Sequence, residues 1–479
     1  MSLARPRRIV IIGGGVSGLA AAHRVVEQGQ ALGLDVEPVL LEASARLGGI
    51  IRTERHEGFV VEHGPDSFLS EKPWALALCR RLGLEDHLLR TDDRFRRTYV
   101  AFRGALHPLP EGFQLLAPTR LGPFARSRLF SWPGKLRMGL DLVLPRGSDP
   151  DESLGAFVRR RLGREALERV AQPLVAGIYT ADPDSLSLAA TMPRFQEVER
   201  RERSLILGLW RASRQAPAAH AGTSGARWSL FVTLRDGMEE LVRTLAARLP
   251  AGAVRLGTRV TDVVREDGRW RVLTAAGGAE DADAVVLACE APQAARLLRY
   301  LDPGVSLLLD GIPYAGSATV TLAFRRQDVA HALDGFGFVV PRVEGRPIIA
   351  CTFSSVKYPG RAPEGLALLR VFVGGATDEA ALAAPDATLV DTARAQLAEL
   401  LGARGEPLFA LVARYPKAMP QYQVGHLTRV EAIELALRRH PGLALAGGAY
   451  RGVGIADCVH AGESAVDRLL GVEPAAPAP

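Results

Sequence analysis

The strongest pattern in the chain is an early apolar run that ends in glycines and leads into an alanine-rich segment. Residues 9–12 are all apolar, glycines follow, and residues 16–22 are mostly small or apolar. This order predicts a buried parallel strand, a tight turn and a helix. Gly13, Gly15 and Gly18 have the spacing G-x-G-x-x-G, which permits a sharp turn, close approach of backbone to a pyrophosphate, and tight helix packing. The stretch therefore predicts a dinucleotide-binding turn with the phosphates at the helix N-terminus.

The residue at the end of the second strand of this unit helps to distinguish between the candidate cofactors. Residues 36–41 lead to Glu42, whose carboxylate can accept hydrogen bonds from ribose hydroxyls and disfavours the extra phosphate of NADP. A second glycine pair, Gly48 and Gly49, is not part of the NAD dehydrogenase pattern. It resembles the E-x-x-x-R-x-G-G continuation of flavoproteins related to amine oxidases, in which the chain runs back along the FAD pyrophosphate. An ordinary loop with two glycines is the alternative.

Hydrophobic periodicity farther along the chain predicts both helices and strands. The predicted helices lie at 73–83, 153–162, 164–171 (ended by Pro173), 187–190, from 238 to 249, and 386–401. The predicted strands are a pair within 99–109, a β-meander at 254–256, 259–266 and 269–274, a parallel strand at 282–289 that rejoins the first sheet, and a strand at 409–414. A second sheet, the floor of a substrate cavity, is predicted from 317–324, 336–340, 348–353 and 367–373.

The C-terminal part repeats the order of strand, glycine turn and helix. Residues 443–458 carry it, and the helix is predicted to begin near Gly454 and run to Leu470. The N-terminus of such a helix favours negative charge on a reduced flavin. Cys458 lies inside this helix, where a buried structural thiol is favoured over a covalent flavin link. Residues 215–224 predict a flexible loop, and the Pro/Ala-rich residues 473–479 predict a disordered tail.

Apolar and aromatic residues alternate with arginines between residues 112 and 145. Such a mixture suits a segment that lies in a membrane interface, and a helical subdomain packed on its neighbours is the alternative. The whole chain has a net charge of +6, while residues 90–214 hold 22 basic and 14 acidic side chains. This basic block points to anionic lipid or to a substrate with carboxylates, and the chain has no nucleic-acid-binding motif to accompany it.

Composition sets further bounds. A chain of 479 residues predicts two or three domains, and no apolar run reaches the 18 residues that suggest a membrane-spanning helix. The first strand begins within a few residues of Met1, so no signal peptide is expected. The four cysteines are far apart and form no metal-binding spacing, which favours reduced thiols in a cytoplasmic setting. We see no Ser/His/Asp set and no metal cluster, so we expect no catalytic side chain and no bound metal.

Several motifs together resemble the protoporphyrinogen oxidases, an FAD-dependent family within the amine-oxidase-like flavoproteins. They extend from Ile9 to about Leu470. They are the two glycine motifs above, Glu62-His63-Gly64-Pro65, Gln172 to Tyr179, Leu234 to Met238, and Tyr450 to Ile455.

This resemblance implies an α/β (α+β) protein with three domains. A Rossmann-like FAD-binding domain would comprise 1–72, 225–295 and 425–472, a mixed-sheet substrate domain 73–98 and 296–424, and a helical, basic, membrane-binding domain 99–214. The implied reaction converts protoporphyrinogen IX to protoporphyrin IX in haem biosynthesis, in three two-electron steps through non-covalent FAD, with oxygen as acceptor and hydrogen peroxide as product. The implied partners are a membrane surface at the inner face of the cell membrane, ferrochelatase as the next haem-pathway enzyme, and a second copy of the chain.

The resemblance also assigns candidate site residues. A substrate propionate would pair with Arg97, although Arg94, Arg96 and Arg103 crowd the same alignment. Tyr415 lies where relatives carry an aromatic residue near the flavin, often Trp. The implied FAD contacts are Gly13, Gly14, Gly15, Val16, Ser17, Gly18, Glu42, Ala43, Ile50, Gly64, Pro65, Asp66, Ser67, Val260, Tyr415, Val453, Gly454 and Ile455.

Three alternatives remain open at this point. A coproporphyrinogen III oxidase of the coproporphyrin-forming type shares the fold and the chemistry but accepts four carboxylates. A flavin amine oxidase or a carotenoid desaturase shares the first and last motifs. A non-catalytic flavin-binding or porphyrin-binding partner in haem synthesis would bind the cofactor without turnover.

Overall fold

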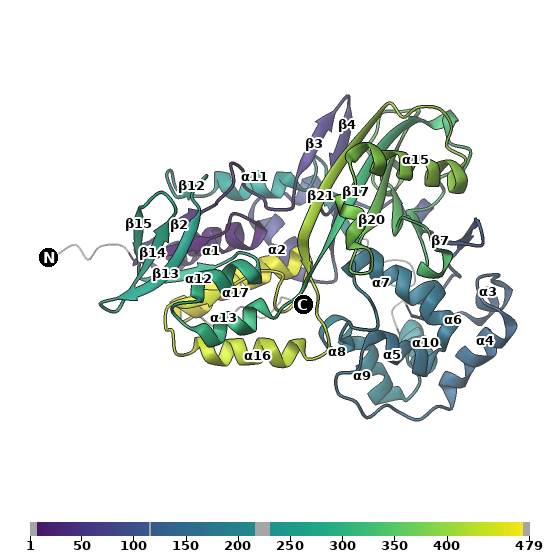
Figure 1. Cartoon of the computed structure of the whole chain (residues 1–479), viewed down its shortest axis with the longest axis horizontal. Helices are drawn as coiled ribbons and strands as arrows, with labels where there is room; N and C mark the ends of the chain where they lie inside the picture. The colour runs from purple at the N-terminus through teal and green to yellow at the C-terminus, as the bar shows by residue number, and fades with distance from the viewer. Residues whose placement is uncertain (1–6, 115, 216–229, 473–479) are drawn as a thin grey trace.

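The structure is a computed structural model that describes residues 7–114, 116–215 and 230–472. The predicted loop beyond Gln215 and the predicted tail at 473–479 lie outside these residues. Figure 1 shows three regions: one built around the first strand on the left, a large sheet at the upper right, and a group of helices at the lower right. The mixed α/β architecture predicted from the sequence is confirmed.

The first region is a parallel sheet covered on both faces. Its strand order is β12 (Val254–Arg255), β2 (Val36–Leu41), β1 (Arg7–Ile12), β16 (Ala284–Leu287) and β22 (Leu443–Leu445). The alternation of β1 explains the two layers, because Ile9 and Ile11 face one core while Val10 and Ile12 face the other. The core of Ile9 and Ile11 is filled by α1 (Val16–Leu32), α2 (Pro73–Arg81), α11 (Glu239–Ala247) and α17 (Ile455–Leu470).

The opposite face of the first sheet is covered by helices and a small antiparallel sheet. These elements are α12 (Ala291–Leu298), α13 (Pro303–Asp310), α16 (His426–Leu437), and β13 (Val260–Glu266), β14 (Arg269–Thr274) and β15 (Ala279–Ala282). The prediction that 282–289 rejoins the first sheet is confirmed, since β16 pairs with β1 in parallel. The predicted meander is wrong at its first strand, because β12 instead pairs in parallel with β2.

The second region is a mixed sheet with β21 (Phe409–Pro420), β17 (Tyr314–Arg325), β20 (Leu366–Gly374), β19 (Ala350–Phe353), β18 (Gly337–Val339), β7 (Thr98–Phe102) and β8 (Ala105–Pro108), in that order. All neighbours are antiparallel except β18 and β7. One face of this sheet packs on α15 (Asp386–Leu401). The apolar side chains at positions 369, 371 and 373 of β20 lie on this face. Strands β7 and β8 lie in this sheet, which groups residues 98–108 in space with the second sheet rather than with the helices that follow them.

Short elements connect the two sheets and border them. They are β3 (Thr53–His56), β4 (Phe59–Glu62), β5 (Phe68–Leu69), β6 (Leu88–Arg90), β11 (Phe231–Leu234), α14 (Ser354–Lys357), and the single-turn helices η1 (Glu85–His87), η2 (Asp93–Phe95), η6 (Arg326–Asp328), η7 (Arg342–Glu344) and η8 (Glu379–Ala383).

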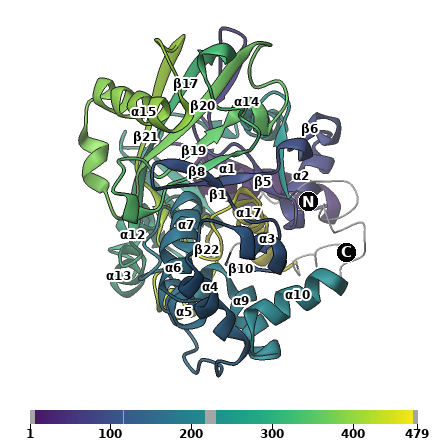
Figure 2. The same ribbon diagram turned by 90° about the vertical axis from the view of Figure 1, so that its right-hand side faces the viewer.

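The third region packs on the other face of the second sheet, where Val100, Phe102 and Val339 join its core. Figure 2 shows these helices gathered below that sheet. They are α3 (Leu121–Arg126), α4 (Trp132–Gly139), η3 (Leu140–Leu142), α5 (Leu154–Arg161), α6 (Arg164–Ala166), η4 (Leu167–Ala171), α7 (Gln172–Tyr179), α8 (Leu188–Thr191), α9 (Pro193–Glu202) and α10 (Leu205–Gln215), preceded by β9 (Phe113–Gln114) and β10 (Ala117–Pro118). None of the described helices combines the length and the apolar character that crossing a membrane requires.

The prediction that Pro173 ends a helix is wrong. The helical backbone continues through it into α7, and the five residues before α7 form a π-helical turn, η4. A proline inside an α-helix clashes with the carbonyl four residues earlier and removes one hydrogen bond. A π-turn changes the hydrogen-bond register at this point, so the proline occupies the first turn of a new α-helical segment.

Candidate functional site

The turn between β1 and α1 leaves room for a side chain at only one of its three fingerprint glycines. Gly13 has a φ of +113°, and a Cβ there would lie 2.6 Å from the carbonyl oxygen of Ala288. A Cβ on Gly18 would lie 1.9 Å from the carbonyl oxygen of Gly13. A Cβ on Gly15 would meet no atom within 4 Å. The protein itself therefore requires Gly13 and Gly18, whereas the open side of Gly15 fits a pyrophosphate that approaches the backbone.

Glu42 lies at the carboxyl end of β2, directly beside this turn. Its Oε2 accepts a hydrogen bond of 2.6 Å from the N–H of Gly14, and its Oε1 accepts one of 2.7 Å from the N–H of Ser44. The neighbouring Ala43 is exposed. These contacts hold the carboxylate beside the glycine turn, and its role in binding the ribose stays a prediction.

The chain then returns along the turn, as the second glycine pair predicts. Gly48 bridges to Gly15 and donates a 2.8 Å hydrogen bond to Gly14. A Cβ on Gly64 would lie 1.8 Å from the carbonyl oxygen of Ile50, so the segment at Gly64 to Ser67 lies against the returning chain. The side chain of Ile50 is exposed. The structure thus brings together three predicted FAD-binding stretches that the sequence separates.

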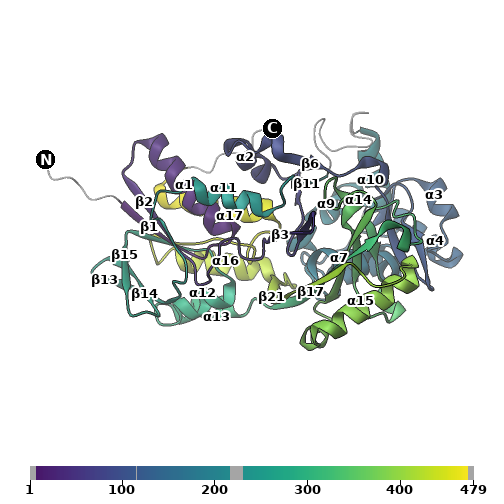
Figure 3. The same ribbon diagram turned by 90° about the horizontal axis from the view of Figure 1, so that it is seen from above.

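The N-terminus of α17 lies at the same place. A Cβ on Gly462 would lie 2.2 Å from the carbonyl oxygen of Ser17, so α17 and α1 are in direct backbone contact, and Figure 3 shows them side by side. Lys72 Nζ donates to both carboxylate oxygens of Asp457 at 2.7 Å, which ties the segment after Ser67 to the first turn of α17. The side chain of Cys458 interacts with Ser17, so the start of α17 lies beside the glycine turn. The contact of Val453 to Ile455 with FAD stays a prediction.

Cys458 lies in the second turn of α17. Burial raises the pKa of its thiol to about 11, so the group stays protonated at neutral pH. A protonated, buried thiol is a poor nucleophile, which agrees with non-covalent cofactor binding.

Two further predicted contacts lie at the margins of this site. Tyr415 is half-buried on β21, paired with Ser317, and burial raises its pKa against the influence of Arg370 and of Arg46 in the returning segment. Val260 is buried with Leu41 in the core on the face of the first sheet opposite α1. The role of both residues in binding FAD stays a prediction.

A partly buried ion pair supports the Gly64 to Ser67 segment. Lys357 Nζ donates to both oxygens of Asp66, at 3.1 and 2.9 Å. Burial opposes ionisation of Asp66, but the charges of Lys357 and Arg370 lower its pKa to about 2. Burial raises the pKa of Glu62, against the charge of Arg361 at 3.9 Å. Sequence reasoning missed Lys357, Arg361 and Arg370, because residues far along the chain carry no local signal of this contact.

The proposed propionate-binding arginine is already paired in this structure. Arg97 Nη1 donates a 2.8 Å hydrogen bond to Asp334, whose other oxygen accepts one of 2.6 Å from the hydroxyl of Tyr99. Arg94 pairs with Asp92. The assignment of Arg97 to the substrate stays a prediction, and substrate would have to replace Asp334.

Several half-buried apolar side chains pack against the core of the helical region. Five of them, from α7, from β20, from the residue before β19 and from the segment before α17, are Leu174, Tyr179, Ile349, Phe372 and Val453, and we call them the apolar wall. The stretch Gln172 to Tyr179 supplies two members of this set.

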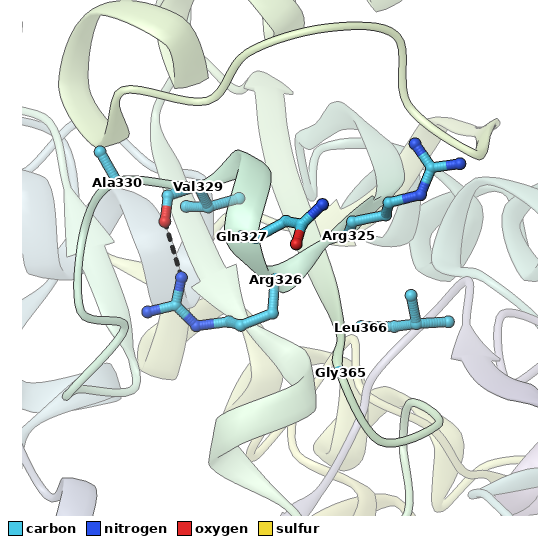
Figure 4. Close-up of a pocket in the computed structure, with 7 residues that line it drawn as sticks. All are labelled: Arg325, Arg326, Gln327, Val329, Ala330, Gly365 and Leu366. Carbon is cyan, nitrogen blue, oxygen red and sulfur yellow. Dashed lines mark hydrogen bonds between the residues drawn. The ribbon is translucent and has the colours of Figure 1, made fainter.

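The cavity drawn in Figure 4 belongs to another part of the molecule. It has a volume of about 660 Å³ and lies at the Arg325 end of β17, where Arg326 donates a 2.7 Å hydrogen bond to the carbonyl of Val329. The other end of this strand, at Tyr314, bonds to Ala291 of the first region. A strand of 12 residues spans about 40 Å. The cavity is therefore remote from that end of the strand.

One group of potential metal ligands comes together that the sequence did not predict. The ligand atoms of His87, Asp236 and Glu240 lie within 4.8 Å of one another. Within the protein, His87 is hydrogen-bonded to Glu240, and Arg55 forms an ion pair with Asp236. These carboxylates are thus already partnered.

Comparison with known proteins agrees with this geometry. A family model described as flavin containing amine oxidoreductase matches residues 16–470. Two coproporphyrinogen III oxidases are similar to the chain. That of Propionibacterium freudenreichii is 39% identical, and the alignment covers 98% of this chain and 92% of the relative. That of Bacillus subtilis is 37% identical, and the alignment covers 97% of this chain and 98% of the relative. A crystal structure from Exiguobacterium sp. 255-15, provisionally named protoporphyrinogen oxidase, has a TM-score of 0.85 and 33% identity, and covers 97% of this chain and 98% of its own.

The family match begins just after Gly15 and includes α1, the returning segment, the second sheet and α17. The structural convergence of these segments and the family match lead to the same cofactor. The chain belongs to the flavin-containing amine oxidoreductase family and is an FAD-dependent oxidoreductase.

Proposed function

We propose that this protein oxidises a porphyrinogen to the corresponding porphyrin in haem synthesis, and that its preferred substrate is coproporphyrinogen III. The single observation that carries the proposal is the identity of 37–39%, over nearly the whole chain, to two bacterial coproporphyrinogen III oxidases. Conversion of a porphyrinogen to a porphyrin removes six electrons. With oxygen as acceptor, three molecules of oxygen are reduced to three molecules of hydrogen peroxide.

The residues of the site suit such a reaction without a catalytic side chain. FAD, when bound, accepts a hydride from substrate and passes the electrons to oxygen. The Gly13 to Gly18 turn, Glu42 and the N-terminus of α17 would hold the cofactor. The apolar wall that includes Leu174 and Phe372 would orient the macrocycle and exclude water, which is the main requirement for hydride transfer.

Protoporphyrinogen IX is the second candidate substrate. It is favoured by the provisional name of the Exiguobacterium structure, whose fold this chain shares over nearly its full length. The two substrates differ in charge, because coproporphyrinogen III carries four carboxylates and protoporphyrinogen IX carries two. Basic side chains that bind substrate carboxylates, as the sequence predicts for Arg97, would therefore distinguish the substrates more strongly than the apolar wall does.

Direct turnover of both porphyrinogens tests the proposal. The purified protein is loaded with FAD, and porphyrin fluorescence and peroxide are followed under air with each substrate. We expect a kcat/KM for coproporphyrinogen III at least tenfold above that for protoporphyrinogen IX. The opposite ratio would assign the second candidate. Protein that binds FAD but oxidises neither substrate would contradict both and support a non-catalytic flavin-binding role.

A further inference from the structure

Arg370 is a buried cation without a carboxylate partner. It lies in the middle of β20 with 6% of its surface exposed. Leu369 and Val371, on either side of it, face the core under α15, so Arg370 points to the opposite face, where it meets the segment at His63 and Gly64. Among the described residues, no carboxylate is within ion-pair distance of its guanidinium. A buried charge in this state is costly unless other groups compensate for it.

The hydrogen bonds of Arg370 compensate for only part of this cost. Nη2 donates to the carbonyl oxygens of His63 at 2.8 Å and Gly64 at 2.5 Å. The guanidinium carbon lies 4.8 Å from the centre of the Phe372 ring. Nε is buried and has no acceptor among the described residues. An unsatisfied N–H on a charged group indicates that a polar or anionic group is missing from its surroundings.

The surrounding charges do not cancel. The ionisable side chains that act on Arg370 or on its acidic neighbours are Glu62, Asp66, Lys357, Arg361 and Tyr415. Burial raises the pKa of the Tyr415 phenol, which is neutral, so the charged groups, with Arg370, are three basic and two acidic. The cluster therefore has an excess of at least one positive charge, because Lys357 pairs with Asp66 and Arg361 lies nearest Glu62.

The position of this excess charge is defined by backbone contacts. Gly49 lies against Gly15, and the next residue, Ile50, lies against Gly64. The carbonyl oxygen of Gly64 in turn accepts a hydrogen bond from Arg370. A continuous path thus leads from the pyrophosphate end of the candidate site to the guanidinium. Because the dinucleotide would extend along this path, Arg370 lies next to the backbone that is expected to border the flavin ring.

We propose that Arg370 is a positioning residue that fixes the backbone at Gly64 and, by its uncompensated charge, stabilises the negative charge of reduced FAD. The consequence is a raised midpoint potential of the bound cofactor, which makes the protein a better electron acceptor. This inference rests on the FAD cofactor of the family and not on which porphyrinogen is the substrate. It can therefore fail or hold independently of the proposed function.

The test is the midpoint potential of FAD bound to Arg370→Gln, measured spectroscopically against reference dyes without any substrate. We expect the reduction equilibrium constant to fall at least tenfold, which is about 30 mV for a two-electron couple. Arg370→Lys retains the charge, so its potential should lie nearer the wild-type value, although its FAD affinity should fall. Arg346→Gln is the matched control, because Arg346 is also largely buried but bonds to α15 on the far face of the sheet.

Two results would overturn the proposal: an unchanged potential in Arg370→Gln, or an equal fall in Arg370→Gln and Arg370→Lys. If Arg370→Gln does not fold or retain FAD, Asp66→Asn decides. This variant removes a negative charge from the same cluster and leaves Arg370 in place, so the potential should rise. A potential that stays constant or falls in Asp66→Asn would contradict the role of the cluster charge.

Discussion

At the scale of single residues, two glycines of one sequence motif have different physical reasons to be glycine. Gly18 has no room for a Cβ because the carbonyl of Gly13 lies against it, whereas Gly15 has open space on that side. Gly15 has a φ of −70°, which any residue can adopt. The fold therefore needs Gly18, whereas Gly15 is expected to be needed only for the approach of the cofactor.

Substitutions at the two positions should separate folding from FAD binding. We expect Gly18→Ala to destabilise the apoprotein by about 1–3 kcal/mol through overpacking. We expect Gly15→Val to leave the free energy of unfolding of the apoprotein nearly unchanged and to weaken FAD binding by more than tenfold. Urea unfolding and quenching of flavin fluorescence measure the two effects. Tight FAD binding by Gly15→Val would contradict the placement of the pyrophosphate.

Because of Asp66, the free energy of unfolding should depend on pH in the acid range. Its pKa is about 2 in the folded protein and near 4 in the unfolded chain, so its contribution is complete above pH 4 and is lost as pH falls through 2. Asp66→Asn should therefore cost the apoprotein about 2 kcal/mol at pH 7 and about half of that near pH 3. Urea unfolding at both values measures the difference.

The control for this prediction is Asp386→Asn, since Asp386 forms an exposed ion pair with Arg414. Exposed pairs contribute less than about 1 kcal/mol. A cost for Asp66→Asn that is the same at pH 3 as at pH 7 would show that Asp66 acts by packing rather than by charge.

At the scale of elements, the site depends on the close contact of two helices. The helices α1 and α17 follow the two glycine turns that are predicted to bind the phosphates and the flavin, and they meet where Gly462 faces the backbone of Ser17. Both helices fill the same core beneath the first sheet. A change in their separation would move the two halves of the site relative to each other.

Gly462→Ala should act through this separation. A Cβ at 2.2 Å from the carbonyl of Ser17 forces the helices apart, so we expect a loss of about 1–3 kcal/mol and weaker FAD binding. Gly122→Ala, in the exposed helix α3 with no atom near its Cβ, is the control and should be neutral or stabilising by less than about 1 kcal/mol. Thermal unfolding with and without FAD compares them. Equal effects of the two variants would contradict the packing explanation.

At the scale of the whole molecule, the helical region exposes apolar side chains that no described residue covers. Some of the apolar residues predicted at a membrane interface are core, such as Phe124 and Met138, but others in α3, α4 and just beyond are largely exposed. The exposed members are Leu121, Trp132, Leu136, Leu140, Leu142 and Val143. Lys135 lies 4.5 Å from the centre of the Trp132 ring, so cations border the apolar patch.

We propose that this patch docks on anionic lipid, as the basic composition of the region suggests. Leu136→Glu should reduce binding to vesicles that contain anionic lipid at least several-fold, and wild-type binding should weaken as salt rises. Leu435→Glu, at a similarly exposed leucine on α16, is the control and should bind as the wild type does. Vesicle flotation measures both. Identical binding by the two variants would contradict docking through this patch.

Much of the fold and part of the site could be predicted because their signals are local. The apolar run, the glycine spacing and the acidic residue at the end of β2 determine a strand, a turn and a helix within 35 residues. The strands of the second sheet were located from their β-branched and aromatic content, and the parallel strand β16 from its continuous apolar run. These features depend on short-range sterics and on which faces are buried, both of which the order of residues expresses directly.

Tertiary structure alone decided the rest, because it depends on which distant segments come together. The pairing of β12 with β2 depends on long-range register, and the helix continues through Pro173 because a π-turn precedes it. Arg97 forms an ion pair with Asp334, and Arg370 is buried against the carbonyl of Gly64. In both contacts the partners are hundreds of positions apart in the sequence. Sequence determined that a flavin dinucleotide could bind, and the packing of two sheets determined which charges surround it, since electrostatic interactions act through space and not along the chain.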